Sequence, residues 1–153
     1  MENKIKKALN SITMTYYIMY VAAIFTAFFI YYLNTKSLNY AVSKETSIAV
    51  SSLIIIYVIG SIPLSLGGFY WLTKKWIALP SKEERLIKYT KFAKLRLVII
   101  GLGVVIGIIA FYILGESSVI FCAGMSAVAL IFCKPSMIKI INELDLDAEE
   151  NEE

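Results

Sequence analysis

Four apolar stretches, separated by polar segments, dominate the pattern of this chain. They cover residues 14–33, 48–72, 95–114 and 117–133. About 20 apolar residues in a helix cross the roughly 30 Å of hydrocarbon in a bilayer, and lipid offers the backbone no hydrogen-bonding partner outside the helix. The pattern therefore predicts an all-α integral membrane protein with four transmembrane helices, whose membrane domain covers residues 14–134.

The polar segment between the second and third stretches predicts the orientation. Residues 73–97 hold eight of the fifteen basic residues, and basic segments that flank transmembrane helices stay in the cytoplasm. The loop 73–94 and both termini are therefore expected to be cytoplasmic. This arrangement leaves only Lys36 and Lys44 as basic residues on the outer side of the membrane. It indicates a multi-pass protein of a bacterial inner (cytoplasmic) membrane.

The third apolar stretch is expected to belong to a longer helix. Ser81 and Glu84 have the spacing of a capping box, in which each side chain bonds to the backbone amide of the other residue, and so predict a helix that begins at Lys82. Nothing in the pattern ends that helix before Leu114. At 1.5 Å per residue it is about 50 Å long, so its first turns are expected to project into the cytoplasm.

Shorter segments are predicted at the two ends of the chain. Residues 1–13 alternate lysine with apolar residues and are expected to form an amphipathic helix on the inner membrane surface. The first apolar stretch lacks a small-residue cleavage site and is expected to remain as a signal anchor. Residues 135–153 are expected to form a cytoplasmic surface helix with Ile138, Ile141 and, less regularly, Ile140 and Leu144 as its apolar positions, followed by a disordered acidic tail from Asp145.

Small residues in the third and fourth stretches indicate close helix packing. Gly103 and Gly107 form a G-x-x-x-G pair, which lets two helix backbones approach each other in lipid. Gly124 and its small neighbours offer a matching surface, and the hairpin of these two helices is expected to be the stable core. Glycine is also common in membrane helices without such a role. The pattern does not decide whether a partner helix lies in the same chain.

The second stretch carries polar residues at membrane depth. Tyr57, Ser61 and Ser65 fall near one face of a helix. Pro63 removes one helix hydrogen bond, so a kink is expected there, and the two serines are expected to help satisfy the carbonyl that the proline frees. This face is either a polar seam with a role in transport or a set of interhelical hydrogen bonds, and the second interpretation is favoured.

Composition supports the membrane class and limits the chemistry. The chain is 58% hydrophobic, has a formal net charge of +3 and contains no histidine, and its mean hydropathy is +0.69. Without histidine, neither a Ser-His-Asp triad nor an H-E-x-x-H zinc site can form. Cys122 and Cys133 are about 16 Å apart along one helix, too far for a disulfide, and are expected to be small buried residues. The sequence therefore predicts no catalytic residue, no metal, no cofactor and no nucleic-acid partner.

The basic residues of the predicted third helix form a candidate contact surface, namely Lys82, Arg85, Lys88, Lys91 and Lys94. They are expected either to bind anionic lipid headgroups or to contact a partner, and the chain's own acidic tail is predicted on the same side. The alternative is that these charges act only as the topology signal.

These features together favour binding over catalysis. The expected function is that of a small non-enzymatic accessory or scaffold subunit that interacts with other membrane proteins or with itself in the lipid bilayer. The alternative is a small homo-oligomeric transporter or channel that uses the seam of Tyr57, Ser61, Pro63 and Ser65. Four helices without a polar interior make no wide pore alone, so this alternative requires oligomers. A lipid-handling enzyme is a third interpretation with no residue set behind it.

Overall fold

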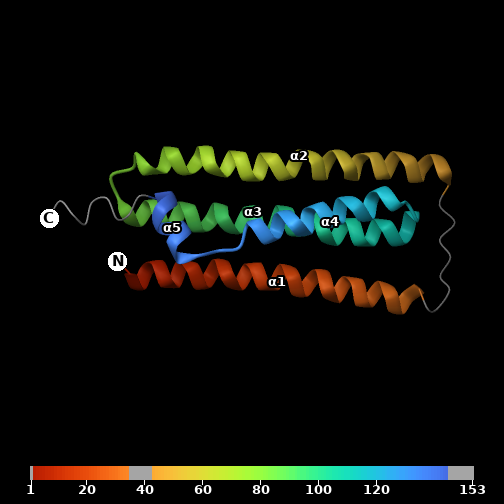
Figure 1. Cartoon of the computed structure of the whole chain (residues 1–153), viewed down its shortest axis with the longest axis horizontal. Coiled ribbons are helices and arrows are strands. Elements are labelled where there is room, and N and C mark those ends of the chain that lie inside the picture. Colours follow the sequence, from red (N-terminus) through yellow and green to blue (C-terminus); the bar gives the residue numbers. More distant parts are fainter. Residues whose placement is uncertain (1, 35–42, 145–153) are drawn as a thin grey trace.

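The protein is built from helices throughout its described part. The computed structural model describes residues 2–34 and 43–144, and every regular element in these ranges is an α-helix (Figure 1). In chain order the helices are α1 (Glu2–Asn34), α2 (Lys44–Ile77), α3 (Lys82–Leu114), α4 (Ser117–Phe132) and α5 (Met137–Leu144). The all-α class predicted from the sequence is confirmed for these residues. The predicted acidic tail lies outside them.

Three of the helices, α1, α2 and α3, are long and apolar enough to cross a membrane. α4 has 16 residues, which corresponds to about 24 Å. It counts as part of a fourth candidate span only when it is joined to α5, from which it is bent by 78°. The described part of the chain thus has the helices of a membrane protein. That the chain crosses the membrane four times stays a prediction.

α3 is the central helix of the bundle. It packs against α1, α2 and α4, and Figure 1 shows α3 and α4 between α1 and α2. The start of α1, the turn between α2 and α3, and α5 lie at one end of the bundle, here called the N-terminal end (Figure 1). Buried side chains from all five helices form one cluster, and a smaller cluster joins α2, α3 and α4.

Residues 2–13 are helical, as predicted, but they do not form a separate surface helix, because α1 continues from them into the first apolar stretch without a break. Ile5, Ala8, Ile12 and Tyr16 recur every three or four residues and are buried. This spacing places them on one face of the helix. That apolar face packs on the bundle instead of lying on a membrane surface.

The polar segment 73–94, predicted as the connection between two spans with a helix from Lys82 onward, is also helical in its first residues. α2 continues to Ile77 and α3 begins at Lys82, so residues 78–81 connect the two helices. Lysine, glutamate and leucine in this segment have good helix propensity, and both helices extend beyond the apolar stretches that predicted them. The basic residues therefore lie on two packed helix ends.

Local capping residues determine the bounds of α3. Ser81 Oγ accepts a hydrogen bond from the amide of Glu84 at 3.5 Å, which is one of the two contacts that the capping box predicts. At the other end Gly115 has a φ of 68°, a left-handed conformation that favours glycine, and its amide bonds to the carbonyl of Phe111. α3 therefore begins and ends where the sequence predicts.

α2 continues through Pro63 as one helix, and Figure 1 shows no sharp bend in it. The hydroxyls of Ser61 and Ser65 bond to carbonyls three residues before them. They do not satisfy the carbonyl of Ile59, which the proline frees, because a serine hydroxyl in a helix bonds three or four residues back. The predicted role of the serines is therefore wrong, and the kink at Pro63 stays a prediction.

α5 is more deeply packed than a surface helix. Ile140 and Leu144 are 1% and 0% exposed, whereas Ile138, which the sequence places on the apolar face, is 71% exposed. Ile141 is partly buried against the larger cluster. α5 packs against α1 and α2 and is hydrogen-bonded to Tyr89 of α3. All three helices are far away in the chain, so the local pattern could not show which face of α5 they cover.

Candidate functional site

Gly103 and Gly107 pack against α4 of the same chain. A Cβ atom placed at Gly107 would lie 2.7 Å from Cβ of Ala123, and one at Gly103 would lie 2.9 Å from Oγ of Ser126. Both glycines therefore allow an approach of the two helices that a side chain would prevent. Gly124 does not take part, because a Cβ atom there would meet no atom within 4 Å. Its predicted role in packing is wrong.

A third glycine of α3 serves the contact with α1. A Cβ atom at Gly101 would lie 2.8 Å from Sδ of Met19. Two residues along a helix rotate the side-chain direction by about 200°, so Gly101 and Gly103 face different neighbours. The sequence analysis singled out the G-x-x-x-G pair and missed Gly101, although the extra glycine was a visible signal for a second close contact.

A cavity of about 670 Å³ lies between α2 and α3, and three of the four seam residues, Tyr57, Ser61 and Ser65, line it. The Tyr57 hydroxyl donates a hydrogen bond to the carbonyl of Ile99 in α3 at 2.9 Å. The serine hydroxyls bond to the backbone of α2. Pro63 is exposed and is not among the lining residues. The seam hydroxyls thus donate to backbone carbonyls of the two helices that form the cavity.

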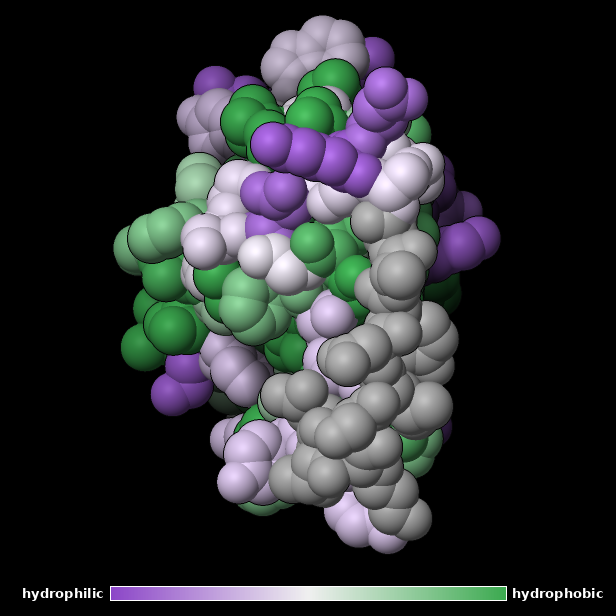
Figure 2. Space-filling view, turned by 90° about the vertical axis from the view of Figure 1, so that its right-hand side faces the viewer, coloured by the Kyte–Doolittle hydropathy of each residue, from purple (hydrophilic) through white to green (hydrophobic). Residues whose placement is uncertain are grey.

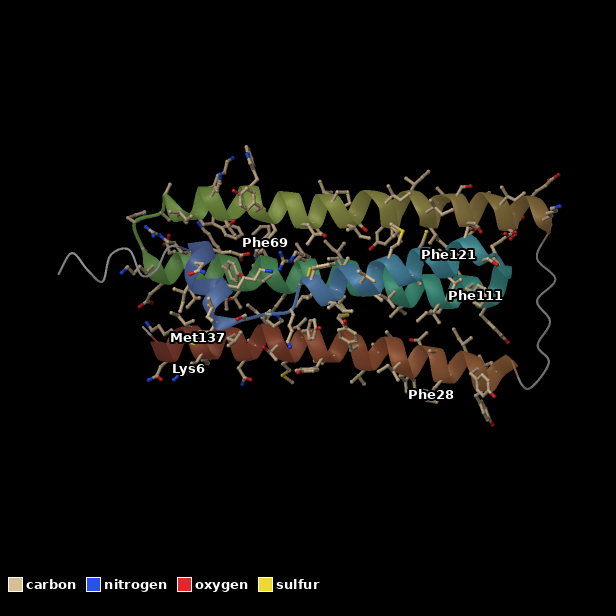
Figure 3. The ribbon with its side chains drawn as sticks, viewed as in Figure 1. Lys6, Phe28, Phe69, Phe111, Phe121 and Met137 are labelled. Carbon is tan, nitrogen blue, oxygen red and sulfur yellow. The ribbon has the colours of Figure 1, made fainter. Side chains whose placement is uncertain are left out.

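Arg96 of α3 also lines this cavity. Its side chain is 9% exposed, and its guanidinium carbon lies 4.0 Å from the ring centre of Phe69, within the range of a cation–π contact. Figure 3 shows Phe69 between α2 and α3. Nε of Arg96 has no hydrogen-bond partner among the described residues. This arginine was predicted only as a topology charge, although its place as the second residue of the apolar stretch 95–114 was a visible signal for a packed cation.

A groove of about 790 Å³ lies between α1 and α3 at the N-terminal end, lined by Lys4 and Lys7 of α1, by Lys91 and Lys94 of α3, and by apolar side chains of both helices. Lys4 forms an ion pair with Glu83. The hydrogen bond from Lys4 and its positive charge lower the pKa of the Glu83 carboxyl from its ordinary value of 4.5. An apolar floor with several cations at its rim is chemically suited to an anionic lipid.

The five basic residues predicted as one contact surface do not lie together. Lys91 and Lys94 line the groove between α1 and α3. Lys88 is exposed, and Lys82 is half-buried. Arg85 is 6% exposed, and its Nε donates a hydrogen bond to the carbonyl of Leu79 at 2.6 Å. The tight turn between α2 and α3 brings that carbonyl over the first turn of α3. Arg85 therefore stabilises the turn, and its contact with headgroups or with a partner stays a prediction.

Tyr89 joins α3 to α5. It is 3% exposed, and its hydroxyl donates a hydrogen bond to Oε2 of Glu143 at 2.6 Å. Burial, and secondly the hydrogen bond to this carboxylate, raise the pKa of Tyr89, which precedes the predicted third span. The sequence analysis missed this pair, because the two residues are far apart in the chain and neither belongs to a motif.

The part of α1 after Tyr16 packs on the bundle along one side only, where Met19 and Tyr20 contact the larger cluster. No residue from Tyr17 to Leu33 is buried, and the exposed large side chains include Val21, Ile24, Phe25, Phe28, Phe29, Tyr31 and Tyr32. Figure 3 shows Phe28 pointing away from the other helices. Figure 2, a view onto the end of the bundle where α1 ends and α2 begins, shows hydrophobic residues mainly on its left-hand side. α1 thus presents an apolar surface that no other described helix covers.

Among residues 2–34 and 43–144, no group of three or more His, Cys, Asp or Glu residues could hold a metal ion. Comparison of the chain with family models, with curated proteins and with solved structures finds no match. Any functional assignment therefore depends on three features: the packed central helix α3, the cavity and the groove that lie along it, and the uncovered surface of α1.

Proposed function

We propose that the protein is a small non-enzymatic accessory or scaffold subunit of a bacterial inner membrane. The observation that carries the proposal is the uncovered apolar surface of α1 between Tyr17 and Leu33. The apolar part of α1 is 6% buried, against 39% for that of α3. A helix that packs on its own chain along one half only leaves the other half for a helix of another membrane protein.

The aromatic side chains on this half of α1 support a protein contact. Phe25, Phe28, Phe29 and Tyr32 have the spacing of one helix face, and the rings of Phe25 and Phe29 stack with centres 6.3 Å apart. Lipid tails are as apolar as a partner helix, so association in a membrane depends on close packing. Rigid rings offer a large, well-defined contact area. The partner is expected to pack a helix with small residues on this face.

Four spans with both termini in the cytoplasm are part of the proposal. The start of α1, the α2–α3 turn and α5 share one end of the bundle (Figure 1), and the lysine-rimmed groove lies at that same end. Positive charge collects on the cytoplasmic side of membrane proteins. In this arrangement α4 completes the fourth crossing, and α5, bent by 78° from it, lies at the cytoplasmic surface.

Purification from the native membrane in a gentle detergent, with mass spectrometry and particle mass measured together, tests the proposal. A second membrane protein in fixed stoichiometry is expected. The double variant Phe28→Ala, Phe29→Ala is expected to lose it, whereas Leu53→Ala on α2 is expected to keep it, because Leu53 is similarly exposed (68%, against 71% for Phe28). A homo-oligomer with nothing attached contradicts the accessory role. A partner that the phenylalanine variant retains contradicts the assigned surface.

One observation favours the alternative of a small homo-oligomeric transporter or channel, namely the cavity between α2 and α3 that contains the seam and Arg96. A solute or ion flux into liposomes that is lost in Tyr57→Phe and Ser61→Ala variants would support it. The hydroxyls of both residues already donate to backbone carbonyls. A transport path needs polar groups that can exchange partners with the passing solute. Because these hydroxyls are already bonded to the backbone, the scaffold role is favoured over the transporter.

A further inference from the structure

The cavity between α2 and α3 contains a buried cation without a paired anion. Arg96 is 9% exposed, its Nε lacks a hydrogen-bond partner, and no described carboxylate forms an ion pair with it. A guanidinium in a protein stays charged, and burial of a charge without a partner is unfavourable. The ring of Phe69 offers its face to the cation but no acceptor for its N–H groups. Glu143 and Arg96 both act electrostatically on Tyr89, but this carboxylate accepts its hydrogen bond from Tyr89 and forms no ion pair with Arg96 among the described residues. The site therefore lacks an anion that accepts hydrogen bonds from Arg96.

The remainder of the cavity is apolar and open to the side of the bundle. Its lining includes the side chains of Ile56, Leu64, Leu72, Phe92, Leu95 and Ile99. Leu64 is 76% exposed, so the cavity faces the lipid rather than the centre of the bundle. A Cβ atom placed at Gly60 or Gly68, which also line the cavity, meets no atom within 4 Å. Its volume of about 670 Å³ falls in the range of small-molecule sites.

We infer that this cavity binds an anionic amphiphile, with an acyl chain between α2 and α3 and a carboxylate or phosphate head that accepts hydrogen bonds from Arg96. The planar guanidinium matches either head through parallel N–H donors. A fatty acid and a phospholipid share this chemistry, and the experiment below separates them. The inference goes beyond the scaffold role and does not depend on the surface of α1.

Trp76 provides a reporter for the site. It is 7% exposed, and its ring centre lies 5.1 Å from that of Phe92, which lines the cavity. A Trp71→Phe background leaves Trp76 as the single tryptophan, and bromine on an acyl chain quenches tryptophan fluorescence only at short range. The full-length protein in an uncharged detergent is titrated with a brominated fatty acid, its methyl ester, and a brominated phosphatidylglycerol. Saturable quenching is expected with one or both anionic probes and not with the ester.

Two pairs of variants locate the head and the chain of the bound molecule. Arg96→Gln is expected to weaken binding roughly tenfold to a hundredfold, the loss expected for charge-assisted hydrogen bonds, and Arg96→Lys is expected to retain more of the affinity. Gly68→Leu fills the cavity and is expected to abolish binding. Gly67→Leu is the matched control, because that position is equally open but does not line the cavity, and it is expected to bind as the parent does.

The outcomes separate the possible sources and occupants. Saturation by the fatty acid alone indicates a free carboxylate, and saturation by the phospholipid alone indicates a membrane lipid; both support the inference. Equal quenching by the methyl ester overturns it, because the charge is then not recognised. Unchanged binding in Arg96→Gln or in Gly68→Leu also overturns it. A Gly68→Leu variant that loses a protein subunit, seen as a fall in particle mass, shows that another helix occupies the cavity and overturns it as well.

Discussion

Gly107→Ala is expected to push α3 and α4 apart. The added methyl group would lie 2.7 Å from Cβ of Ala123, and 3.2 and 3.3 Å from the Cα and N atoms of that residue. Backbone atoms cannot rotate aside, so the helices must shift, and overpacking of this kind costs about 1–3 kcal/mol. Gly103→Ala is expected to cost less, because its nearest neighbour is the Ser126 hydroxyl at 2.9 Å, the end of a side chain that can rotate.

Gly124→Ala is the matched control for these variants. It makes the same chemical change at a helix position where the new methyl group meets no atom within 4 Å. Replacing glycine by alanine inside a helix removes conformational freedom from the unfolded chain and stabilises by about 0.5–1 kcal/mol. The expected free energy of unfolding is therefore highest for Gly124→Ala, followed by the parent, Gly103→Ala and Gly107→Ala. Denaturant unfolding in one fixed detergent, followed by far-UV circular dichroism, measures this order.

A double variant tests the contact itself. Combining Gly107→Ala with Ala123→Gly moves the methyl group from α4 to α3. The 2.7 Å contact between Cβ atoms disappears while the 3.2 Å contact to Cα remains, so partial recovery of the free energy of unfolding is expected. Equal stability of Gly107→Ala and Gly124→Ala, or no recovery in the double variant, would refute the close approach of the helices at this point.

Three polar contacts give further predictions. Tyr57→Phe loses the hydrogen bond to Ile99 and is expected to lower the free energy of unfolding by about 0.6–2 kcal/mol; an unchanged value contradicts this. Arg85→Gln is expected to lower it by about 1.5–3 kcal/mol, since a carbonyl loses its charged donor, whereas Lys88→Gln on the exposed surface is expected to change it by less than about 0.5 kcal/mol. The pKa of Tyr89 is raised above its ordinary value of 10.0, so its contribution to stability is complete below that pH and is lost as the pH rises above it. As the pH rises to about 11, the free energy of unfolding is expected to fall less for Tyr89→Phe than for the parent. An equal fall in both proteins refutes a stabilising role of the Tyr89 hydroxyl.

Helix ends were predictable where a local signal marks them. Ser81 and Glu84 at the start of α3 and Gly115 at its end act through neighbouring backbone atoms, so the sequence contains the whole interaction. The unbroken continuation of α1 through residues 2–13 and of α2 through residues 73–77 was not predicted, because these polar residues extend helices whose apolar faces are covered by distant parts of the chain. Such coverage depends on tertiary contacts that local periodicity does not contain.

The candidate sites were predictable only within single helices. Tyr57, Ser61 and Ser65 share a cavity because their spacing along α2 puts them on one face. The error at Gly124 has a different origin. Small residues occur on several faces of α4, and the rotation of the helix about its own axis decides which of them meets α3. The isolation of Arg96 was equally hidden, since it depends on which side chains α2 brings to the cavity.

The place of α3 between α1 and α2 has a consequence for the order of assembly in a membrane. α1 and α2 precede α3 in the chain, and within the described residues they pack mainly against α3 rather than against each other (Figure 1). Membrane helices associate through contacts between their packed surfaces. Until α3 has been synthesised and inserted, α1 and α2 lack the surface on which each of them packs. A nascent chain that ends at Ile77 therefore holds two separate helices, and tertiary structure begins with the third.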